Sequence, residues 1–220
     1  PYGSLNPRKR LGEILARPLL IHHLVDKQSV EQRTTALLGE VGLPAALVDR
    51  YPVQLSGGQQ QRVAIARAIA VEPRLLVADE PVSALDVSVQ AQVLRLLERI
   101  RNERRLSMVF ISHDLAIVRY LCHRVAVMYL GKIVELADNA TLFSQPRHPY
   151  TSALLSAIPS TRPQRRQRII LSGEVASAAN IPTGCRFHPR CWKAQSICHQ
   201  IEPDLTKVGG SLVACHFPND

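Results

Sequence analysis

The sequence predicts an α/β protein whose sheet is largely parallel. Three observations support this prediction: short apolar runs alternate with amphipathic segments, polar residues follow two of the runs, and a glycine pair begins one amphipathic segment. Alternating strands and helices are typical of parallel sheets, because each parallel strand needs a crossover connection. Ligands bind such sheets at the carboxyl ends of the strands, so those ends are the first candidates for a functional site.

Composition limits the class of protein. The chain has 220 residues, 46% hydrophobic and 20% charged, which is typical of a globular domain with a small appendage. Its net charge of +9 suits nucleic acid, phosphate-bearing ligands or anionic lipid headgroups, and equally a solvated basic surface. Aromatic residues make up 5%, and no basic stretch is interleaved with base-stacking rings. No apolar run approaches the ~20 residues of a membrane span and no signal peptide opens the chain, so a soluble or peripheral protein is expected.

The first fifty residues are expected to form a loop followed by helices. Residues 1–10 (PYGSLNPRKR) are rich in proline, glycine, serine and asparagine, which is typical of turns. In residues 11–48 apolar side chains recur at helical spacing. The dipeptide Tyr51-Pro52 then ends this helical region.

The segment LSGGQQQRVAIARAIA, residues 55–70, predicts a phosphate-binding helix start. A helix N-terminus leaves N–H groups without intrahelical partners and carries partial positive charge. Gly57 and Gly58 have no Cβ, so an anion could approach those donors closely. Ser56 can cap the helix or donate its hydroxyl. The helix is expected to end before Pro73.

Two buried strands separated by a helix are expected next. The runs RLLVADEP (residues 74–81) and SMVFIS (residues 107–112) are short, continuous and apolar, which indicates strands buried on both faces of a parallel sheet. Between them, residues 88–105 carry an apolar stripe at helical spacing. The elements expected after them are a helix at residues 114–121 and two strands at residues 124–136, turning at Gly131.

Polar side chains follow both predicted strands. Asp79 and Glu80 follow the first strand, and His113 follows the second. Because the carboxyl ends of parallel strands meet at one edge, the three side chains predict a single site. One carboxylate can hold Mg²⁺, a second can orient or deprotonate a water, and the imidazole can contact a γ-phosphate. Each of these groups alone is more often a solvated or structural residue.

The composition changes after Pro159. Residues 160–168 contain four arginines and no aliphatic residue, which indicates an exposed linker. Residues 169–220 lack a periodic pattern and are rich in Pro, Gly and Cys, which predicts a small, separately stapled module. Four of the five cysteines lie there, spaced C-x5-C-x6-C-x16-C: Cys185, Cys191, Cys198 and Cys215.

The clustered cysteines predict a metal site. Disulfides are disfavoured in the cytosol, so four nearby thiols indicate either tetrahedral zinc or an iron–sulfur cluster. The spacing lacks the C-x2-C pairs of zinc ribbons, which favours iron–sulfur. His188, His199 and His216 lie close by in the sequence and are alternative ligands.

The motifs LSGGQ, LLVADEP, SALD and SHD, in this order, resemble the ATPase subunits of ABC transporters. Within that family, DEPVSALDVSVQAQVL, VFISHDL, PRHPYTSALLSA and the cysteine-bearing tail resemble dipeptide and oligopeptide importer ATPases of the DppF/OppF type. The resemblance implies part of an ABC-type nucleotide-binding domain with its helical subdomain at residues 1–158. It implies a linker and a small cysteine-rich module at residues 159–220.

The resemblance also implies a role for each motif. Asp79 would be the Mg²⁺ carboxylate, Glu80 would polarise the hydrolytic water, and His113 would be the switch histidine. The tail would carry a [4Fe–4S] cluster at its four cysteines, with Zn²⁺ as the alternative. The residues implied to bind ATP, in the signature and in the D-loop that passes between two ATPase subunits, are Ser56, Gly57, Gly58, Gln59, Ser83 and Asp86.

One expected motif does not occur. The chain contains no G-x-x-x-x-G-K-[ST] phosphate loop, which the resemblance places before Pro1 together with the adenine-stacking aromatic and the Q-loop glutamine. The sequence is therefore expected to be the C-terminal portion of a longer subunit and to be inactive alone. Residues 1–50 would belong to the helical subdomain, with Tyr2 to Pro7 either a contact for the membrane subunits or a plain surface loop.

The resulting functional expectation is an ATP-hydrolysing motor of a peptide importer. It would lie peripherally on the cytoplasmic face of the bacterial plasma membrane. Its partners would be two transmembrane permease subunits, a second and non-identical ATPase and, indirectly, an extracytoplasmic solute-binding protein, with no nucleic acid. The alternatives are a soluble ABC ATPase acting on nucleic acid or ribosomes, and a catalytically silent fragment. Relatives of this type import dipeptides, longer peptides, glutathione or nickel, and the selective contacts belong to other subunits.

Overall fold

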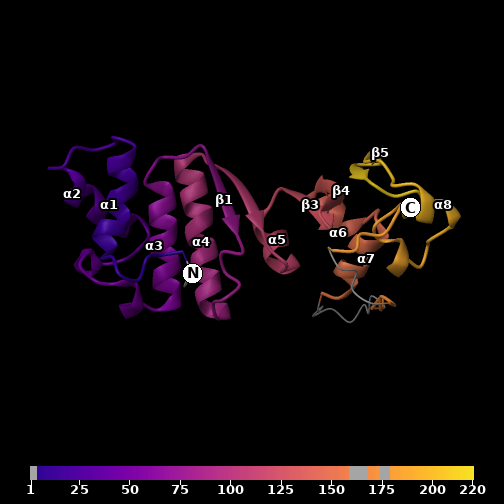
Figure 1. The fold of residues 1–220 in the computed structure, drawn as a ribbon, viewed down its shortest axis with the longest axis horizontal. Helices are drawn as coiled ribbons and strands as arrows, with labels where there is room; N and C mark the ends of the chain where they lie inside the picture. The colour runs from indigo at the N-terminus through magenta and orange to yellow at the C-terminus, as the bar shows by residue number, and fades with distance from the viewer. Residues whose placement is uncertain (1–3, 159–167, 174–178) are drawn as a thin grey trace. The chain divides into compact units, whose positions relative to one another are not determined.

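The computed structural model describes residues 4–158, 168–173 and 179–220. The chain divides into two compact units, Pro1–His113 and Asp114–Asp220. Each unit combines helices with one sheet, and the elements of both are labelled in Figure 1. The boundary expected at residues 158/159 adjoins residues 159–167, which lie outside the described residues together with most of the expected linker, and it stays a prediction.

The first unit contains the expected helices. The region 11–48 is divided by a turn in which His23 has a φ of 53°, so it forms two helices rather than one. The helix predicted from Ser56 and the helix predicted before the second strand are both confirmed. The helices of this unit are α1 (Leu11–Ile21), α2 (Val30–Glu40), α3 (Gly57–Ile69) and α4 (Val87–Arg104), with 3₁₀ turns at Ala45–Leu47 and Pro52–Gln54.

Apolar stripes on these helices form the core of the first unit. Helix α1 packs on α2 and α3, and α3 packs on α4. The side chains that become inaccessible recur every three or four residues, as the sequence periodicity predicts. Fully or almost fully buried members are Leu11, Leu15, Leu37, Leu38, Val63, Ala66, Ile69, Val93, Leu97 and Ile100.

Strands β1 (Leu75–Asp79) and β2 (Ser107–Ile111) pair in parallel, as expected, with Val77 opposite Val109 and Asp79 opposite Ile111. The prediction that both faces are buried is wrong for the described chain. Side chains alternate along β1, so that Leu76 and Ala78 are buried whereas Leu75 and Val77 remain more than half exposed. The rest of this unit covers only one face of the two-stranded sheet, and a continuous apolar run does not reveal how many faces are covered.

The second unit is built on an antiparallel sheet, which corrects the expectation of a largely parallel one. Four strands lie in the order β3-β4-β6-β5, and all neighbouring pairs are antiparallel. The predicted hairpin at Gly131 is confirmed, with a φ of 79° at the glycine. The elements are α5 (Leu115–Leu121), β3 (Arg124–Tyr129), β4 (Lys132–Asp138), α6 (Asn139–Ser144), α7 (Pro149–Ser156), a 3₁₀ turn (His188–Arg190), α8 (Ser196–Gln200), β5 (Thr206–Val208) and β6 (Ser211–Val213).

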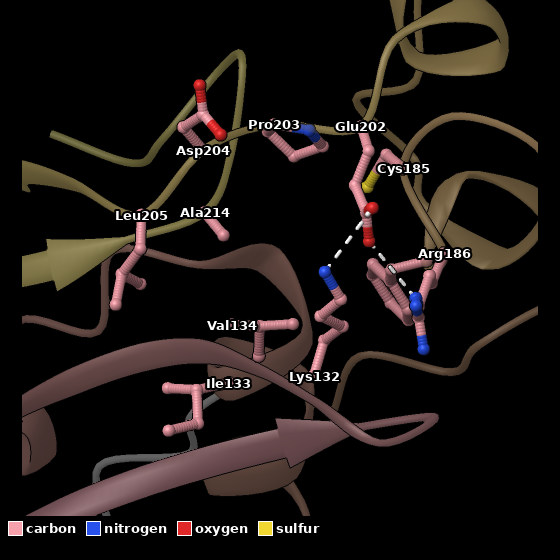
Figure 2. Close-up of a pocket in the computed structure, with 11 residues that line it drawn as sticks. Lys132, Ile133, Val134, Cys185, Arg186, Glu202, Pro203, Asp204, Leu205 and Ala214 are labelled. Atoms are coloured by element: carbon pink, nitrogen blue, oxygen red, sulfur yellow. Dashed lines mark hydrogen bonds and ion pairs between the residues drawn. The ribbon is translucent and has the colours of Figure 1, made fainter.

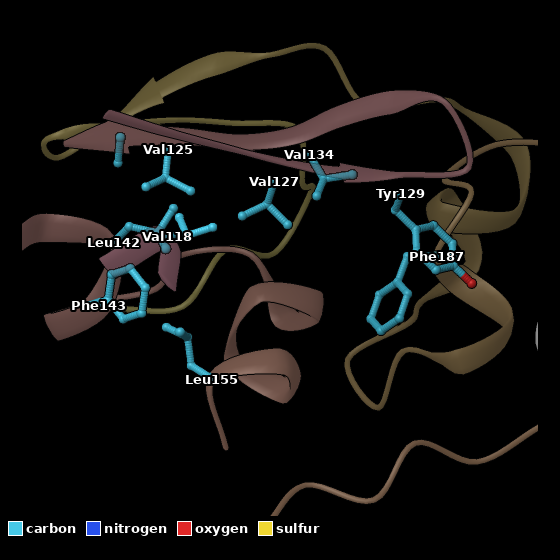
Figure 3. Close-up of a cluster of buried hydrophobic side chains, with 10 residues drawn as sticks. Val118, Val125, Val127, Tyr129, Val134, Leu142, Phe143, Leu155 and Phe187 are labelled. Carbon is cyan, nitrogen blue, oxygen red and sulfur yellow. The ribbon is translucent and has the colours of Figure 1, made fainter. Parts of the chain in front are cut away.

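The C-terminal tail shares its core with the rest of the second unit. Strand β6 pairs with β4, placing Leu212 opposite Leu136. Phe187 is 1% exposed and packs in the same hydrophobic cluster as Val127 and Val134 (Figure 3). A separately stapled cysteine-rich module is therefore not supported. The tail is held by strand pairing and apolar burial, which its irregular sequence pattern concealed.

A buried polar junction organises the start of α7. The Glu135 carboxylate is fully buried and accepts hydrogen bonds from the backbone N–H groups of Arg147 and His148, at 2.8 and 2.9 Å. The His148 ring caps the helix, because its Nδ1 accepts from the Tyr150 N–H at 3.0 Å. Burial lowers the pKa of His148 to about 4.

We expect His148 to make stability fall as pH decreases from about 6.5 to about 4. In this range the unfolded chain binds a proton that the folded chain excludes, so the stabilisation is complete above pH 6.5 and is lost toward pH 4. The shift corresponds to about 3 kcal/mol in the free energy of unfolding. Urea unfolding at a series of pH values should show a shallower pH dependence for His148→Asn, whose amide oxygen can still cap α7. Equal pH dependence in both proteins would contradict the assignment.

Candidate functional site

The predicted strand-end residues come together at the carboxyl ends of β1 and β2. The Glu80 N–H donates to the Ile111 carbonyl at 3.0 Å and so continues the pairing beyond β1. The Glu80 Oε1 atom lies 2.9 Å from His113 Nδ1. A carboxylate only accepts hydrogen bonds, so the ring proton lies on Nδ1 in this contact. The imidazole is 79% exposed and the Glu80 side chain 38%, which leaves both accessible to a ligand.

Glu80 lies at a special backbone position. Its φ of 47° is in the left-handed region, which costs about 1–2 kcal/mol for a residue with a side chain. The conformation ends the strand and starts a turn, in which the Ser83 hydroxyl donates to the Glu80 carbonyl at 3.1 Å. Asp79, the last residue of β1, has an exposed carboxylate. Two consecutive acids thereby have different surroundings.

The signature segment forms a capped helix start, as the sequence predicts. The Ser56 Oγ accepts from the Gln59 N–H at 3.3 Å, and the Gln59 Oε1 accepts from the Ser56 N–H at 3.0 Å. This reciprocal capping box orients the first turn of α3. The N–H groups of Gly57 and Gly58 belong to that first turn, where no intrahelical acceptor exists. The predicted binding role of these residues stays a prediction.

Gly58 also has a packing role that the sequence interpretation did not include. A Cβ at Gly58 would overlap the Cγ1 atom of Val89 in α4, so the glycine allows close contact between the two helices. Next to this contact, Arg62 Nη2 donates to Gln92 Oε1 at 2.8 Å. Helices α3 and α4 therefore run side by side at their first turns, as Figure 1 shows.

The D-loop, Ser83–Asp86, links the acidic strand end to the start of α4. Asp86 caps this helix by accepting from the Val89 N–H at 3.0 Å, and it also accepts from the Ser88 hydroxyl at 2.7 Å. These hydrogen bonds lower the pKa of Asp86, and the bond from the Ser88 hydroxyl has the largest effect. Contacts thus run from Glu80 through the D-loop to Val89 and Gly58. The predicted nucleotide contacts of Ser83 and Asp86 stay predictions.

The N-terminal loop is described in part. Tyr2 of the predicted membrane-subunit contact lies outside the described residues. Leu5 is buried, and the Ser4 carbonyl accepts from Arg67 Nη1 at 2.6 Å, so the loop is attached to α3. Its predicted partner role stays a prediction.

The metal site expected at the four tail cysteines is not supported by the structure. All are free thiols, and the Cys185 N–H donates to the Cys198 carbonyl at 2.8 Å. Burial, as the largest cause, raises the pKa of Cys185 and Cys191, and it raises that of Cys215 to about 11. Within the described residues, no group of three or more His, Cys, Asp or Glu side chains is arranged to hold a metal ion. Neither a [4Fe–4S] cluster nor Zn²⁺ is therefore supported at these cysteines by the described residues.

The sequence interpretation missed an ion-pair network beside these cysteines. Glu202 lies 3.4 Å from Lys132 Nζ and 3.1 Å from Arg186 Nε (Figure 2). The three side chains lie close together at the edge of a cavity, as Figure 2 shows. The cavity has a volume of about 180 Å³ and is lined also by Cys185 and Leu205. The network attaches the tail to the β3–β4 hairpin. No local sequence signal could indicate it, because the partners are 70 and 16 residues apart.

Two segments of the chain match known family models. Residues 4–83 match the family model described as ABC transporter, and residues 134–198 match the one described as oligopeptide/dipeptide transporter, C-terminal region. The dimeric structure of a post-hydrolysis state of the ATP-binding cassette MJ0796, bound to ADP and Pi, is similar with a TM-score of 0.55 and 30% identity. The similarity covers 62% of this chain and 59% of that chain.

Curated relatives narrow the family. The dipeptide transport ATP-binding protein DppF of Escherichia coli (strain K12) is 51% identical over 98% of this chain and 65% of its own length. The oligopeptide transport ATP-binding protein AppF of Bacillus subtilis (strain 168) is 48% identical over 99% of this chain and 67% of its own length. The chain belongs to the ATP-binding proteins of ABC-type peptide transporters.

The chain spans just under two thirds of the length of the two DppF relatives that it matches. None of the helices in the described part of the chain combines the length and the hydropathy that a bilayer-spanning segment requires.

We expect Gly58→Ala to destabilise the protein by about 1–3 kcal/mol, because the added methyl group overlaps Val89 where α3 and α4 meet. Gly39→Ala in α2 is the matched control. A Cβ there meets nothing within 4 Å, so this variant should be about 0.5–1 kcal/mol more stable. Chemical denaturation of the three proteins measures both effects. Equal stability of the two variants would show that the helix contact is not tight.

We expect the Cys215 thiol to alkylate about 100-fold more slowly at pH 8 than an unperturbed cysteine, because its pKa of about 11 leaves little thiolate. Mass spectrometry after timed iodoacetamide treatment measures the rate, which should rise as pH approaches 11. A flat pH profile that becomes steep after addition of a chelator would instead indicate a metal-bound thiolate.

Proposed function

We propose that the complete subunit carrying this chain is the ATP-hydrolysing motor of an ABC importer for dipeptides or oligopeptides. Membership of the peptide-transporter family supports this proposal, and the relatives whose names state peptide transport support the substrate class. The whole activity is proposed for the full-length subunit, since the relatives extend beyond the matched region.

The contact between Glu80 and His113 supports the hydrolytic role most directly. A carboxylate at a parallel strand end can accept a proton from, or orient, a water that attacks the γ-phosphate. His113 Nδ1 is bound to the Glu80 Oε1 atom at 2.9 Å, so the imidazole orients this carboxylate while remaining exposed to a phosphate. We assign Glu80 as the group that polarises the water and His113 as its partner toward the phosphate.

The arrangement of Asp79 fits a magnesium ion. Its carboxylate is exposed at the end of β1 and makes no hydrogen bond or ion pair within the described residues, so its oxygens can bind a cation or its waters. Mg²⁺ retains several waters and commonly uses one or two carboxylates together with the phosphates. When bound, the ion would supply charge neutralisation for the triphosphate.

We propose that the signature of this subunit faces ATP held by a second ATPase subunit. The free N–H groups at the start of α3 suit a phosphate, and the capping box of Ser56 and Gln59 holds that turn. The solved relative bound to ADP and Pi is described as dimeric. The further partners proposed are a non-identical second ATPase, two transmembrane permeases and, indirectly, an extracytoplasmic solute-binding protein.

In this proposal the subunit lies peripherally on the cytoplasmic face of the plasma membrane. ATP binding closes the two ATPase subunits, hydrolysis reopens them, and the permeases follow. An ABC ATPase acting on nucleic acid or ribosomes is not favoured, because the curated relatives are named for peptide transport or import.

We expect Glu80→Gln in the assembled transporter to reduce ATP turnover at least about 100-fold while prolonging the nucleotide-bound closed state, because the amide cannot accept the proton of the water. His113→Ala should reduce kcat strongly as well. ATPase assays and nucleotide trapping on reconstituted transporter measure these effects, with Glu72→Gln as an exposed control outside the site. Wild-type turnover in Glu80→Gln would remove this residue from the mechanism.

A further inference from the structure

The signature helix and the D-loop helix begin with the same arrangement. Helix α3 follows Ser56 and helix α4 follows Asp86, and each of these caps accepts the N–H of the residue three positions later, at 3.3 and 3.0 Å. Each cap residue has an extended backbone, with φ and ψ of −65° and 159° at Ser56 and −66° and 157° at Asp86. Two stretches of different function thus share one local geometry.

A tight turn precedes each cap at the same offset. The N–H of Leu55 donates to the Pro52 carbonyl at 3.1 Å, and the N–H of Leu85 donates to the Val82 carbonyl at 3.1 Å. The first turn leads into the signature. The second turn follows the acidic end of strand β1. Neither turn is part of a strand, so few backbone hydrogen bonds hold it in place.

A glutamine four residues after each cap closes the arrangement. Gln60 in α3 and Gln90 in α4 each reach back to the carbonyl groups eight and five positions earlier. The acceptors are Pro52 and Leu55 for Gln60 Nε2, at 2.9 and 3.2 Å, and Val82 and Leu85 for Gln90 Nε2, at 3.0 and 3.0 Å. We call each set a glutamine clamp.

The clamp requires a side chain with two N–H donors. An amide NH₂ group has two, and both acceptors in each clamp are carbonyl oxygens, so only the nitrogen end of the amide fits there. Glutamate has the same length but offers only acceptors when ionised. Gln60 is 4% exposed, so its carbonyl partners would lose their hydrogen bonds without gaining water.

We infer that Gln60 and Gln90 are positioning residues for the proposed ATPase reaction. Gln60 holds the signature and Gln90 holds the D-loop in the geometry that hydrolysis needs. This inference rests on the proposed function, because it assigns the two loops to nucleotide contact. A displacement of about 1 Å in groups that orient reactants can reduce a rate about 100-fold, so two turns with few other restraints are sensitive points.

The test uses the full-length subunit in the reconstituted transporter with four variants. Gln60→Met and Gln90→Glu remove the donors at similar side-chain length, and Gln90→Arg restores N–H donors at a half-buried position. Gln92→Glu is the matched control, because Gln92 lies on α4 and acts only as an acceptor for Arg62. Gln60→Leu, which also lacks donors and adds no buried charge, serves as a second variant if Gln60→Met does not fold.

Three quantities are measured: kcat, KM for ATP, and amide hydrogen exchange in residues 53–56 and 82–86. We expect a fall in kcat of about 10-fold or more in Gln60→Met and Gln90→Glu, with KM within about twofold, because loop position changes more than nucleotide affinity. Each variant should raise exchange mainly in its own turn. Gln90→Arg should recover most of kcat, and Gln92→Glu should match the wild type.

The outcomes separate this inference from the proposed function. Wild-type kcat in both donor-free variants, or a loss in Gln92→Glu equal to that in Gln90→Glu, would overturn the positioning role. A transporter that does not hydrolyse ATP even as the wild type would overturn the proposed function and, with it, the catalytic part of the inference. Unchanged exchange in residues 53–56 and 82–86 would overturn the clamps themselves, whatever the ATPase result.

Discussion

The parallel pairing of β1 with β2 is the constraint on which the candidate site depends. It aligns Asp79 with Ile111 and lets the Glu80 N–H continue the ladder, so the acidic strand end and His113 arrive at the same edge. Glu80 and His113 are 33 positions apart in the sequence, and no local interaction could bring them together. Once the pairing exists, the left-handed conformation at Glu80 directs the chain into the D-loop and on to α4. The chemistry proposed for this edge therefore follows from a backbone arrangement rather than from any single side chain.

Helix starts provide the second level of organisation. Polar caps at Ser56 and Asp86 satisfy donors of the first turn, and the small residue at Gly58 lets α3 and α4 approach closely there. The glycine that the sequence suggested as space for an anion thus also has a role in helix packing. Free N–H groups at the first turn remain available in either interpretation, so the packing role and a phosphate-facing role are compatible.

The irregular tail of the second unit is held by apolar burial, strand pairing and ion pairs. Phe187 fills the core, β6 extends the sheet of the β3–β4 hairpin, and Glu202 bridges two basic residues. Burial of an aromatic side chain and three-residue strand pairing leave almost no periodic signal in the sequence. The cysteines were the most visible feature of this region, yet the contacts that hold it are apolar and electrostatic.

The sequence by itself determined the helices, the two parallel strands, the hairpin at Gly131 and the order of the motifs, because these depend on residue periodicity, turn residues and caps over short ranges. The resemblance of the motifs LSGGQ, LLVADEP, SALD and SHD led to the family, which the comparisons confirm. Only the tertiary structure decided that one face of β1 and β2 stays exposed, that the tail joins an antiparallel sheet, and that Gln60 and Gln90 hold their turns. Face coverage, strand partners and side-chain reach are properties of three-dimensional proximity, and one-dimensional spacing cannot specify them.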